Sequence, residues 1–179
     1  MPKIVVTEFI TLDGIIEAPN EWSMPYWNDD IGAFKHEELF DADAQLLGRV
    51  TYDGFAAAWP NMTEETGDFG ERMNGMPKYV VSKTLEKAEW NNSTIVRDLD
   101  EVAKLDGTLL VAGSSTLIQS LIARDLVDEY RLLVYPVVLG KGKRLFAEGT
   151  STDIAFAEAR DIGSGVTALR YRRAEPKAE

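Results

Sequence analysis

The stretch LLVAGSSTL at residues 109–117 decides how the chain is expected to fold. The apolar run that ends at Ala112 is short and is bounded by a glycine, as in a buried strand. Gly113 breaks the strand, and Ser114 or Ser115 can cap a helix that begins directly afterwards. A strand that passes through a glycine into a helix is typical of α/β proteins with a mainly parallel sheet.

The rest of the chain repeats this alternation of strands and helices. Helices are predicted after Asn28 or Asp29, at 51–58, from Asp98 to 104, and from the serines to about 123. The last two strands flank Gly163-Ser164-Gly165 and predict an antiparallel hairpin. The predicted strands are 4–11, 44–47, 78–82, 94–97, 108–112, 130–138, 154–162 and 166–172. This pattern predicts one α/β domain over residues 1–173 and a frayed tail over 174–179.

The segment 61–77 has no clear periodicity and contains three glycines and four acidic residues. We predict a mobile surface loop there, which is either a lid over a site or a solvated connection.

Composition narrows the classes of partner. Thirty acidic and 19 basic residues in a chain of 179 give a formal net charge of -11. This charge argues against a nucleic acid and against an anionic membrane surface as a partner. Cysteine is absent, so disulfides and thiolate chemistry are excluded, and with a single histidine we expect no metal site. Without a leader-like start or a long apolar run, the chain is expected in the cytoplasm.

A second junction between strand and helix lies at LLGRVT, residues 46–51. Gly48 lets the backbone turn sharply or approach a ligand. Arg49 stands near the start of a helix, where a cation opposes the positive end of the helix dipole. A bound anion would reverse that penalty by meeting backbone N–H groups and the guanidinium together. The alternative is a surface arginine that pairs with a nearby carboxylate.

Two other junctions offer polar groups at the same expected edge of the sheet. Ser82 and Lys83 follow a strand and suit a phosphate, although they are also ordinary turn residues. The helix start after Gly113 presents free N–H groups to an anion, unless its serines serve only as caps. Ligands of open α/β sheets bind outside the carboxyl ends of the strands, so the three junctions together predict an anion site.

The order and spacing of five segments resemble the dihydrofolate-reductase-like superfamily. The closer resemblance is to stand-alone relatives of the riboflavin-biosynthesis reductase domain, the C-terminal domain of the bacterial bifunctional deaminase-reductase. The segments are FITLDG (9–14), LLGRVTY (46–52), PKYVVSKT (77–84), LLVAGSSTL (109–117) and LVDEYRLLVYPVVLGKGKRLF (126–146). The resemblance implies a dihydrofolate-reductase-like, three-layer α/β fold with a mostly parallel central sheet, antiparallel C-terminal strands and flanking helices. It also implies a homodimer.

The resemblance implies NADPH as the hydride donor. Gly48, Arg49 and Thr51 would then hold the cofactor phosphates, and Ser82 and Lys83 would lie near the 2′-phosphate. The pyrophosphate would be wrapped by Gly113, Ser114, Ser115 and Thr116. In relatives, a glycine pair after this strand can carry a cis peptide. That pair reads Ala112-Gly113 here, and Ala112 is expected to narrow the cofactor groove.

Hydride transfer also requires a proton donor. Asp13 follows the first strand and is a candidate acid or substrate anchor, if partial burial raises its pKa. The alternative for Asp13 is an ordinary turn residue. Glu129 begins a later strand and is the second candidate, with a structural hydrogen bond as its alternative.

Two groups of side chains are candidates for substrate binding. Trp22 and Trp27 could stack on a flat heterocycle, or they could pack in a core or a dimer interface. Lys143 and Arg144 belong to the densest basic cluster of the chain and could meet a substrate phosphate, or they could lie on a solvated loop.

The sequence therefore predicts an NADPH-dependent reductase of a small pyrimidine- or pterin-like heterocycle or of a carbonyl compound. The resemblance is to the 5-amino-6-(5-phosphoribosylamino)uracil reductase of riboflavin biosynthesis. The chain lacks the Cys/His zinc signature of a deaminase domain, which weakens a dedicated riboflavin role. A dihydrofolate reductase and a non-catalytic dimeric nucleotide- or pterin-binding protein are the alternatives.

Overall fold

Strand β1 (Lys3–Thr11) lies inside the sheet and supplies side chains to both of its faces. Successive side chains of a strand point to opposite faces. Accordingly, Val6 packs in the core that includes α7 (Ser115–Ala123), whereas Val5 packs in the core that includes residues of α2 (Asp29–Asp41), α3 (Arg49–Ala58) and α5 (Asp68–Gly75). The structure is a computed structural model that describes residues 1–175.

The sheet has eight strands in the order β4-β3-β2-β5-β1-β6-β8-β7. The first six strands of the chain run parallel to one another, and β8 runs antiparallel to β6 and β7. The other strands are β2 (Ala44–Gly48), β3 (Lys78–Val81), β4 (Ser93–Val96), β5 (Thr108–Val111), β6 (Glu129–Tyr135), β7 (Ile154–Asp161) and β8 (Thr167–Arg173). The short helices are α1 (Pro19–Trp22), η1 (Met24–Tyr26), η2 (Trp59–Asn61), α4 (Thr63–Thr66) and α6 (Leu99–Val102).

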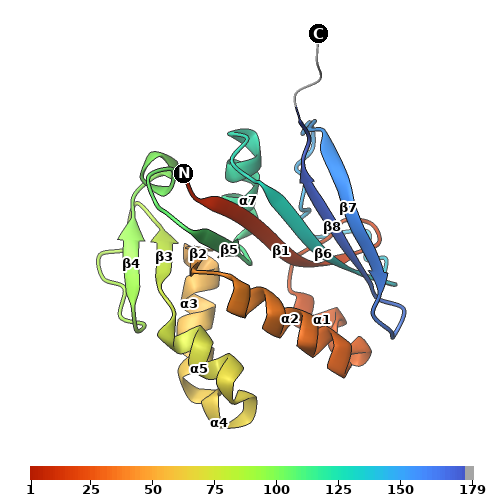
Figure 1. The fold of residues 1–179 in the computed structure, drawn as a ribbon, viewed down its shortest axis with the longest axis horizontal. Helices are drawn as coiled ribbons and strands as arrows, with labels where there is room; N and C mark the ends of the chain where they lie inside the picture. Colours follow the sequence, from red (N-terminus) through yellow and green to blue (C-terminus); the bar gives the residue numbers. More distant parts are fainter. Residues whose placement is uncertain (176–179) are drawn as a thin grey trace.

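Helices cover both faces of this sheet, with α2, α3 and α5 on one face and α7 on the other (Figure 1). The predicted α/β fold class, with a mostly parallel sheet and antiparallel C-terminal strands, is confirmed. The predicted tail falls largely on residues 176–179, which lie outside the described residues. None of the helices in residues 1–175 has the length and apolar character needed to cross a membrane.

The predicted helix caps are present. The Asn28 side chain accepts a hydrogen bond from the backbone N–H of Ile31, and Asp98 does the same for Glu101. The predicted strand 130–138 ends early at Tyr135 because Pro136 has no N–H to continue the ladder. This run is apolar because it forms a strand inside the sheet, between β1 and β8.

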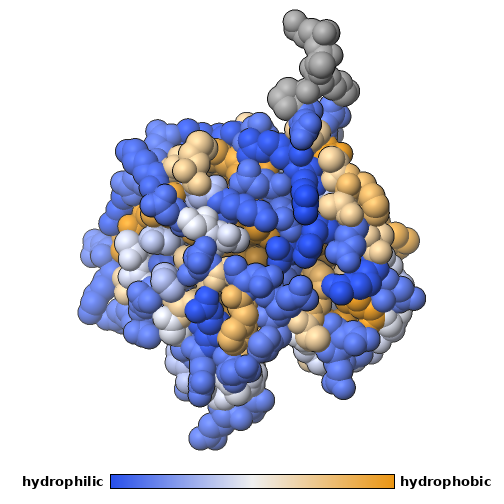
Figure 2. Space-filling model, viewed as in Figure 1, coloured by the Kyte–Doolittle hydropathy of each residue, from blue (hydrophilic) through white to orange (hydrophobic). Residues whose placement is uncertain are grey.

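The predicted mobile loop over 61–77 is wrong, because this segment folds into η2, α4 and α5. Met73 and Met76 are buried in the core beside α2 and α3, so the segment has an apolar side after all. Gly67 turns the chain between α4 and α5 with a φ of 59°. Gly70 lets the helices touch, since a Cβ there would lie 2.2 Å from Thr66 Oγ1. The outer surface of α4 and α5, at the bottom of the view, is mainly hydrophilic (Figure 2).

If α5 packs as described, replacing Met73 by alanine should lower the free energy of unfolding by ~2–5 kcal/mol, the range for buried methionine. The matched control is Glu71→Ala on the exposed side of α5, which should change it by less than ~1 kcal/mol. Urea unfolding followed by circular dichroism measures both. Equal effects of the two substitutions would contradict a packed α5.

Candidate functional site

The chain leaves β1 and β5 toward opposite edges of the sheet. From β1 it passes through α2 to β2, and from β5 it passes through α7, on the other face, to β6. Neighbouring strands whose connections diverge in this way form the crevice in which open α/β sheets bind ligands. β1 and β5 pair only as far as Val6 with Val111, whereas β1 continues beside β6 to Thr11. The sheet therefore opens between β1 and β5 beyond Val6.

Two glycine turns, after β2 and after β5, meet at this opening. The backbone N–H of Gly48 donates to the carbonyl oxygen of Gly113 at 3.1 Å. A Cβ on Gly48 would lie 2.2 Å from Ser114 Oγ, and one on Gly113 would lie 2.5 Å from Thr51 Oγ1. Both positions therefore require glycine, because the two turns touch.

The two helix starts beside these turns differ. Ser114 caps α7 by accepting a hydrogen bond from the N–H of Leu117. At the start of α3 the cap position is Gly48, and no side chain among the described residues caps the helix there. The first N–H groups of α3 therefore have no partner within the helix. They lie where the two glycine turns meet, next to Ser115 and Thr116 in the first turn of α7. Bare N–H groups, hydroxyls and touching glycines are the chemistry that fits a phosphate.

Arg49 stands at the first position of α3 and pairs with Asp53 one turn later. Its Nε lies 2.8 Å from Asp53 Oδ2, and both side chains are exposed. The surface ion pair that the sequence left open as an alternative is therefore present. The backbone of Arg49 directly follows Gly48, so the residue is next to the glycine turns in the chain while its guanidinium is held by Asp53.

Ser82 and Lys83 follow β3, which neighbours β2, so they extend the same edge. Ser82 Oγ accepts the N–H of Leu85 at 3.0 Å, which shapes the turn, and Lys83 is exposed. Arg97, directly after β4, donates from Nη1 to the carbonyl oxygens of Ser82 and Leu85 at 3.0 and 2.8 Å. Sequence reasoning missed Arg97, although a cation at the end of the predicted strand 94–97 was a signal that could have found it.

The peptide bond between Gly113 and Ser114 is cis. It lies one residue after Ala112-Gly113, the pair that corresponds to the glycine pair of the relatives.

The Asp13 carboxylate is held by hydrogen bonds, and the prediction of a raised pKa for it is wrong. Its carboxylate accepts hydrogen bonds from Thr11 Oγ1 at 2.6 Å, from the N–H of Gly140 at 2.7 Å and from the N–H of Leu139 at 3.2 Å. The Thr11 hydroxyl and then the Gly140 N–H lower the pKa of Asp13 to about 2. At neutral pH this group is ionised, so it holds the loop after β6 and has no proton to donate.

Lys143 and Arg144 are brought to Asp13 by that loop. Arg144 Nη1 donates to the carbonyl oxygen of Asp13 at 3.1 Å, and the N–H of Ile16 donates to the carbonyl oxygen of Lys143 at 2.9 Å. Both basic side chains are exposed. They therefore lie at the carboxyl end of β1, in a loop that also contacts α7, because Gln119 Nε2 donates to the carbonyl oxygen of Arg144 at 2.9 Å.

The two candidate tryptophans have different surroundings. Trp22 is buried, with its ring centroid 5.3 Å from that of Tyr135, and it belongs to the core with Ile31 and Phe34. Core packing, the alternative for Trp22, is what the structure shows. Trp27 is 50 % exposed and is the one of the pair with a free surface for a ligand.

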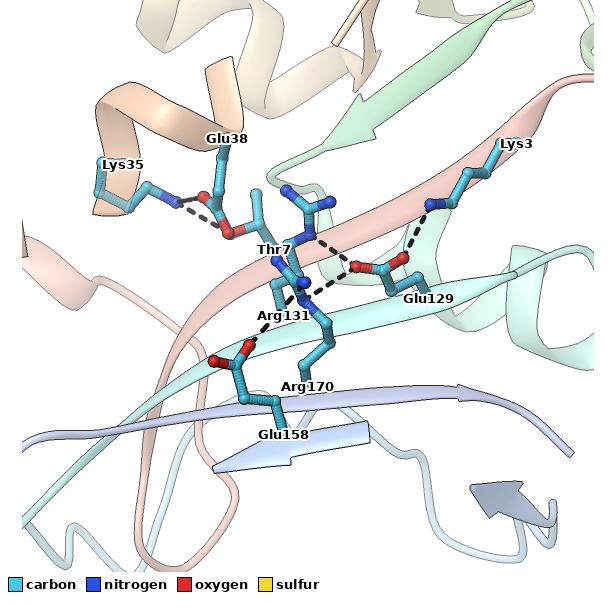
Figure 3. A network of polar contacts seen from close by, with 8 residues as sticks. All are labelled: Lys3, Thr7, Lys35, Glu38, Glu129, Arg131, Glu158 and Arg170. Atoms are coloured by element: carbon cyan, nitrogen blue, oxygen red, sulfur yellow. Dashed lines mark hydrogen bonds and ion pairs between the residues drawn. The ribbon is translucent and has the colours of Figure 1, made fainter. Parts of the chain in front are cut away.

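Glu129 lies at the amino end of β6, opposite Val5, before the sheet opens. Lys3 Nζ, Arg131 Nε and Arg170 Nε lie 2.8, 2.7 and 3.2 Å from its carboxylate (Figure 3). Burial raises the pKa of Glu129, but the hydrogen bonds from Lys3 and Arg131 outweigh burial and hold the pKa below its usual value. The structure therefore assigns Glu129 to an ion-pair cluster, the structural alternative, and separates it from the crevice.

An open hollow of about 800 Å³ lies on the flank of α3, between Tyr52, Ala56, Leu85 and Trp90. None of the predicted site residues lines it. In residues 1–175, no group of three or more His, Asp or Glu side chains is placed to hold a metal ion.

Residues 2–168 match the family of the RibD C-terminal domain. The chain belongs to this family. Its relatives include the uncharacterized protein YyaP of Bacillus subtilis (strain 168), 31% identical over 181 residues, which cover 94% of each chain.

Solved structures share the fold of this RibD C-terminal domain. A putative riboflavin biosynthesis protein from Shewanella sp. PV-4 has a TM-score of 0.74 at 21% identity, covering 97% of this chain and 99% of that one. A pyrimidine reductase-like protein from Corynebacterium diphtheriae has a TM-score of 0.66 at 12% identity, covering 98% and 93%. Dihydrofolate reductase from Enterococcus faecalis, complexed with NADP(H) and RAB-propyl, has a TM-score of 0.63 at 17% identity, covering 97% of each chain. The predicted family resemblance is confirmed.

The contact between the glycine turns predicts opposite effects for two substitutions near the start of α3. Gly48→Ala should lower the free energy of unfolding by ~1–3 kcal/mol, because the new methyl group overlaps Ser114. Gly54→Ala, within α3 and with no atom near the new methyl group, should raise it by ~0.5–1 kcal/mol. Thermal unfolding compares them, and a neutral Gly48→Ala would mean that the turns do not touch.

Proposed function

We propose that this member of the RibD C-terminal domain family is an NADPH-dependent reductase. Its substrate would be a small pyrimidine- or pterin-like heterocycle or a carbonyl compound. The family supports this proposal, as do the structural neighbours, which are a putative riboflavin biosynthesis protein, a pyrimidine reductase-like protein and a dihydrofolate reductase complexed with NADP(H).

The observation that carries the proposal is the contact between the turns at Gly48 and Gly113. It places two helix starts side by side at the opening of the sheet, where a pyrophosphate would meet N–H groups and hydroxyls. Gly48, Thr51 and residues 113–116 would hold this part of the cofactor. When bound, NADPH would supply the hydride.

The cations of the neighbouring turns would select the cofactor. Arg49, Ser82 and Lys83 would bind the 2′-phosphate that distinguishes NADPH from NADH. Arg97 is a positioning residue in this account, because its guanidinium holds the carbonyl groups of Ser82 and Leu85. The chain has a net charge of -11, so its overall field repels an anion, and these local cations would be needed to bind one.

The substrate would enter from the β1 side of the crevice. Lys143 and Arg144 would attract an anionic substituent, Trp27 would offer a flat apolar surface, and Asp13 would keep the loop after β6 in place. The residues of the chain would thus bind and orient the two reactants at the opening between β1 and β5.

Calorimetric titration with NADPH and NADH tests the proposal. The wild type should bind NADPH more tightly, and Lys83→Gln should weaken NADPH binding on the order of tenfold while leaving NADH nearly unchanged, because a charge-assisted contact is lost. The matched control is Lys87→Gln, an exposed lysine four residues further along, which should keep the preference. The absence of binding of either cofactor at millimolar concentration would contradict a reductase.

A further inference from the structure

Glu8 is a buried carboxyl group on β1 at the level where the sheet opens. Thr7 and Phe9 point to the face of α2, since Thr7 bonds to Glu38 and Phe9 packs on Tyr135. Glu8 therefore points to the opposite face, in line with Val6. It pairs with Leu132 on β6 and lies two residues beyond the last β1–β5 pair, Val6 with Val111. Glu8 thus lies where β1 has a partner strand on its β6 side but no longer pairs with β5.

The surroundings of Glu8 keep its proton in place. The residue is only 7 % exposed, and burial raises the pKa of its carboxyl group to about 8. Within residues 1–175 the charged groups that act on it are both on α2: the Lys35 ammonium lowers this pKa and the Glu38 carboxylate raises it. Lys35 and Glu38 also form an ion pair with each other at 2.7 Å (Figure 3), and their opposite charges shift the pKa of Glu8 in opposite directions.

At neutral pH, the carboxyl groups of Asp13, Glu129 and Glu8 differ in protonation state. Asp13 is ionised and bound to the loop after β6, and Glu129 is ionised within its ion-pair cluster. Glu8 remains a carboxylic acid, the state that can donate a proton. A general acid also functions best when its pKa lies near the operating pH.

We infer that Glu8 is the proton donor of the reductase, a role that rests on the proposed function. As the substrate carbon of a C=N or C=O bond gains the hydride of the reduced nicotinamide, the attached nitrogen or oxygen takes the proton from the Glu8 carboxyl group. The double bond becomes single, the nicotinamide is oxidised, and the Glu8 carboxylate formed takes a new proton from water.

The position of the phosphates supports this assignment. A dinucleotide with its pyrophosphate on the Gly48 and Gly113 turns lies across the crevice, and one of its ends then enters the opening beside β1. Glu8 lies on β1 at the level of that opening, two residues beyond the last pair of β1 with β5. A nicotinamide ring in the opening would lie close enough to Glu8 for a charge on the carboxyl group to interact with the ring.

The oxidised ring is positively charged and the reduced ring is neutral, whereas the phosphates are the same in both forms. The ratio of NADP⁺ to NADPH affinity therefore reports charge near the ring alone. In the wild type, this ratio should rise on the order of tenfold between pH 6 and 9, with a midpoint near the pKa of Glu8, because the new carboxylate attracts the charged ring. In Glu8→Gln the ratio should stay constant with pH.

Calorimetric titrations with NADP⁺ and NADPH at several pH values provide these ratios for the wild type, Glu8→Gln and the control Glu37→Gln. Glu37 is an exposed carboxylate on α2, and its variant should behave as the wild type does. A ratio that is constant with pH in the wild type would overturn the inference, even if Glu8→Gln fails to fold. So would the same rise in Glu8→Gln as in the wild type. If the wild type binds neither cofactor, it is the proposed reductase that fails, and the inference falls with it.

Discussion

The separation of β1 from β5 beyond Val6 is the constraint on which the rest of the site depends. It exists because the chain leaves β1 by α2 on one face and leaves β5 by α7 on the other. Diverging connections of this kind form the crevice in which open α/β sheets bind ligands. The glycine turns after β2 and β5 and the loop held by Asp13 both lie at this end of the sheet. If β5 stayed paired with β1 as far as Thr11, neither would be accessible to a ligand.

Three carboxyl groups show how the fold gives one functional group different properties. Asp13 accepts three hydrogen bonds and has a pKa lowered to about 2, whereas Glu129 is held by three cations. Burial raises the pKa of Glu8 to about 8, so this group keeps its proton at neutral pH. Hydrogen bonding, charge and desolvation therefore act in a different balance on each of the three groups.

The sequence predicted the strands, the caps and the meeting of the junctions between strand and helix at one edge, because these depend on local chemistry that residue types reveal. Gly48, Gly113 and Ser82 follow apolar strands, and parallel strands bring such junctions to one edge. The helices in 61–77 escaped prediction because Gly67 and Gly70 hide their periodicity, and Gly70 is explained only by its contact with Thr66. The sequence does not single out Glu8, whereas it made Glu129 a candidate proton donor. Their burial and partners come from distant segments, which no local pattern contains.

The central claim is that a dinucleotide phosphate binds where the turns at Gly48 and Gly113 touch. Backbone amide chemical shifts of the labelled protein, recorded during titration with NADPH, test this most directly. The account predicts that the largest changes fall on residues 48–51 and 113–116, at both turns together. Changes confined to the hollow on the flank of α3, around Tyr52 and Trp90, would contradict it.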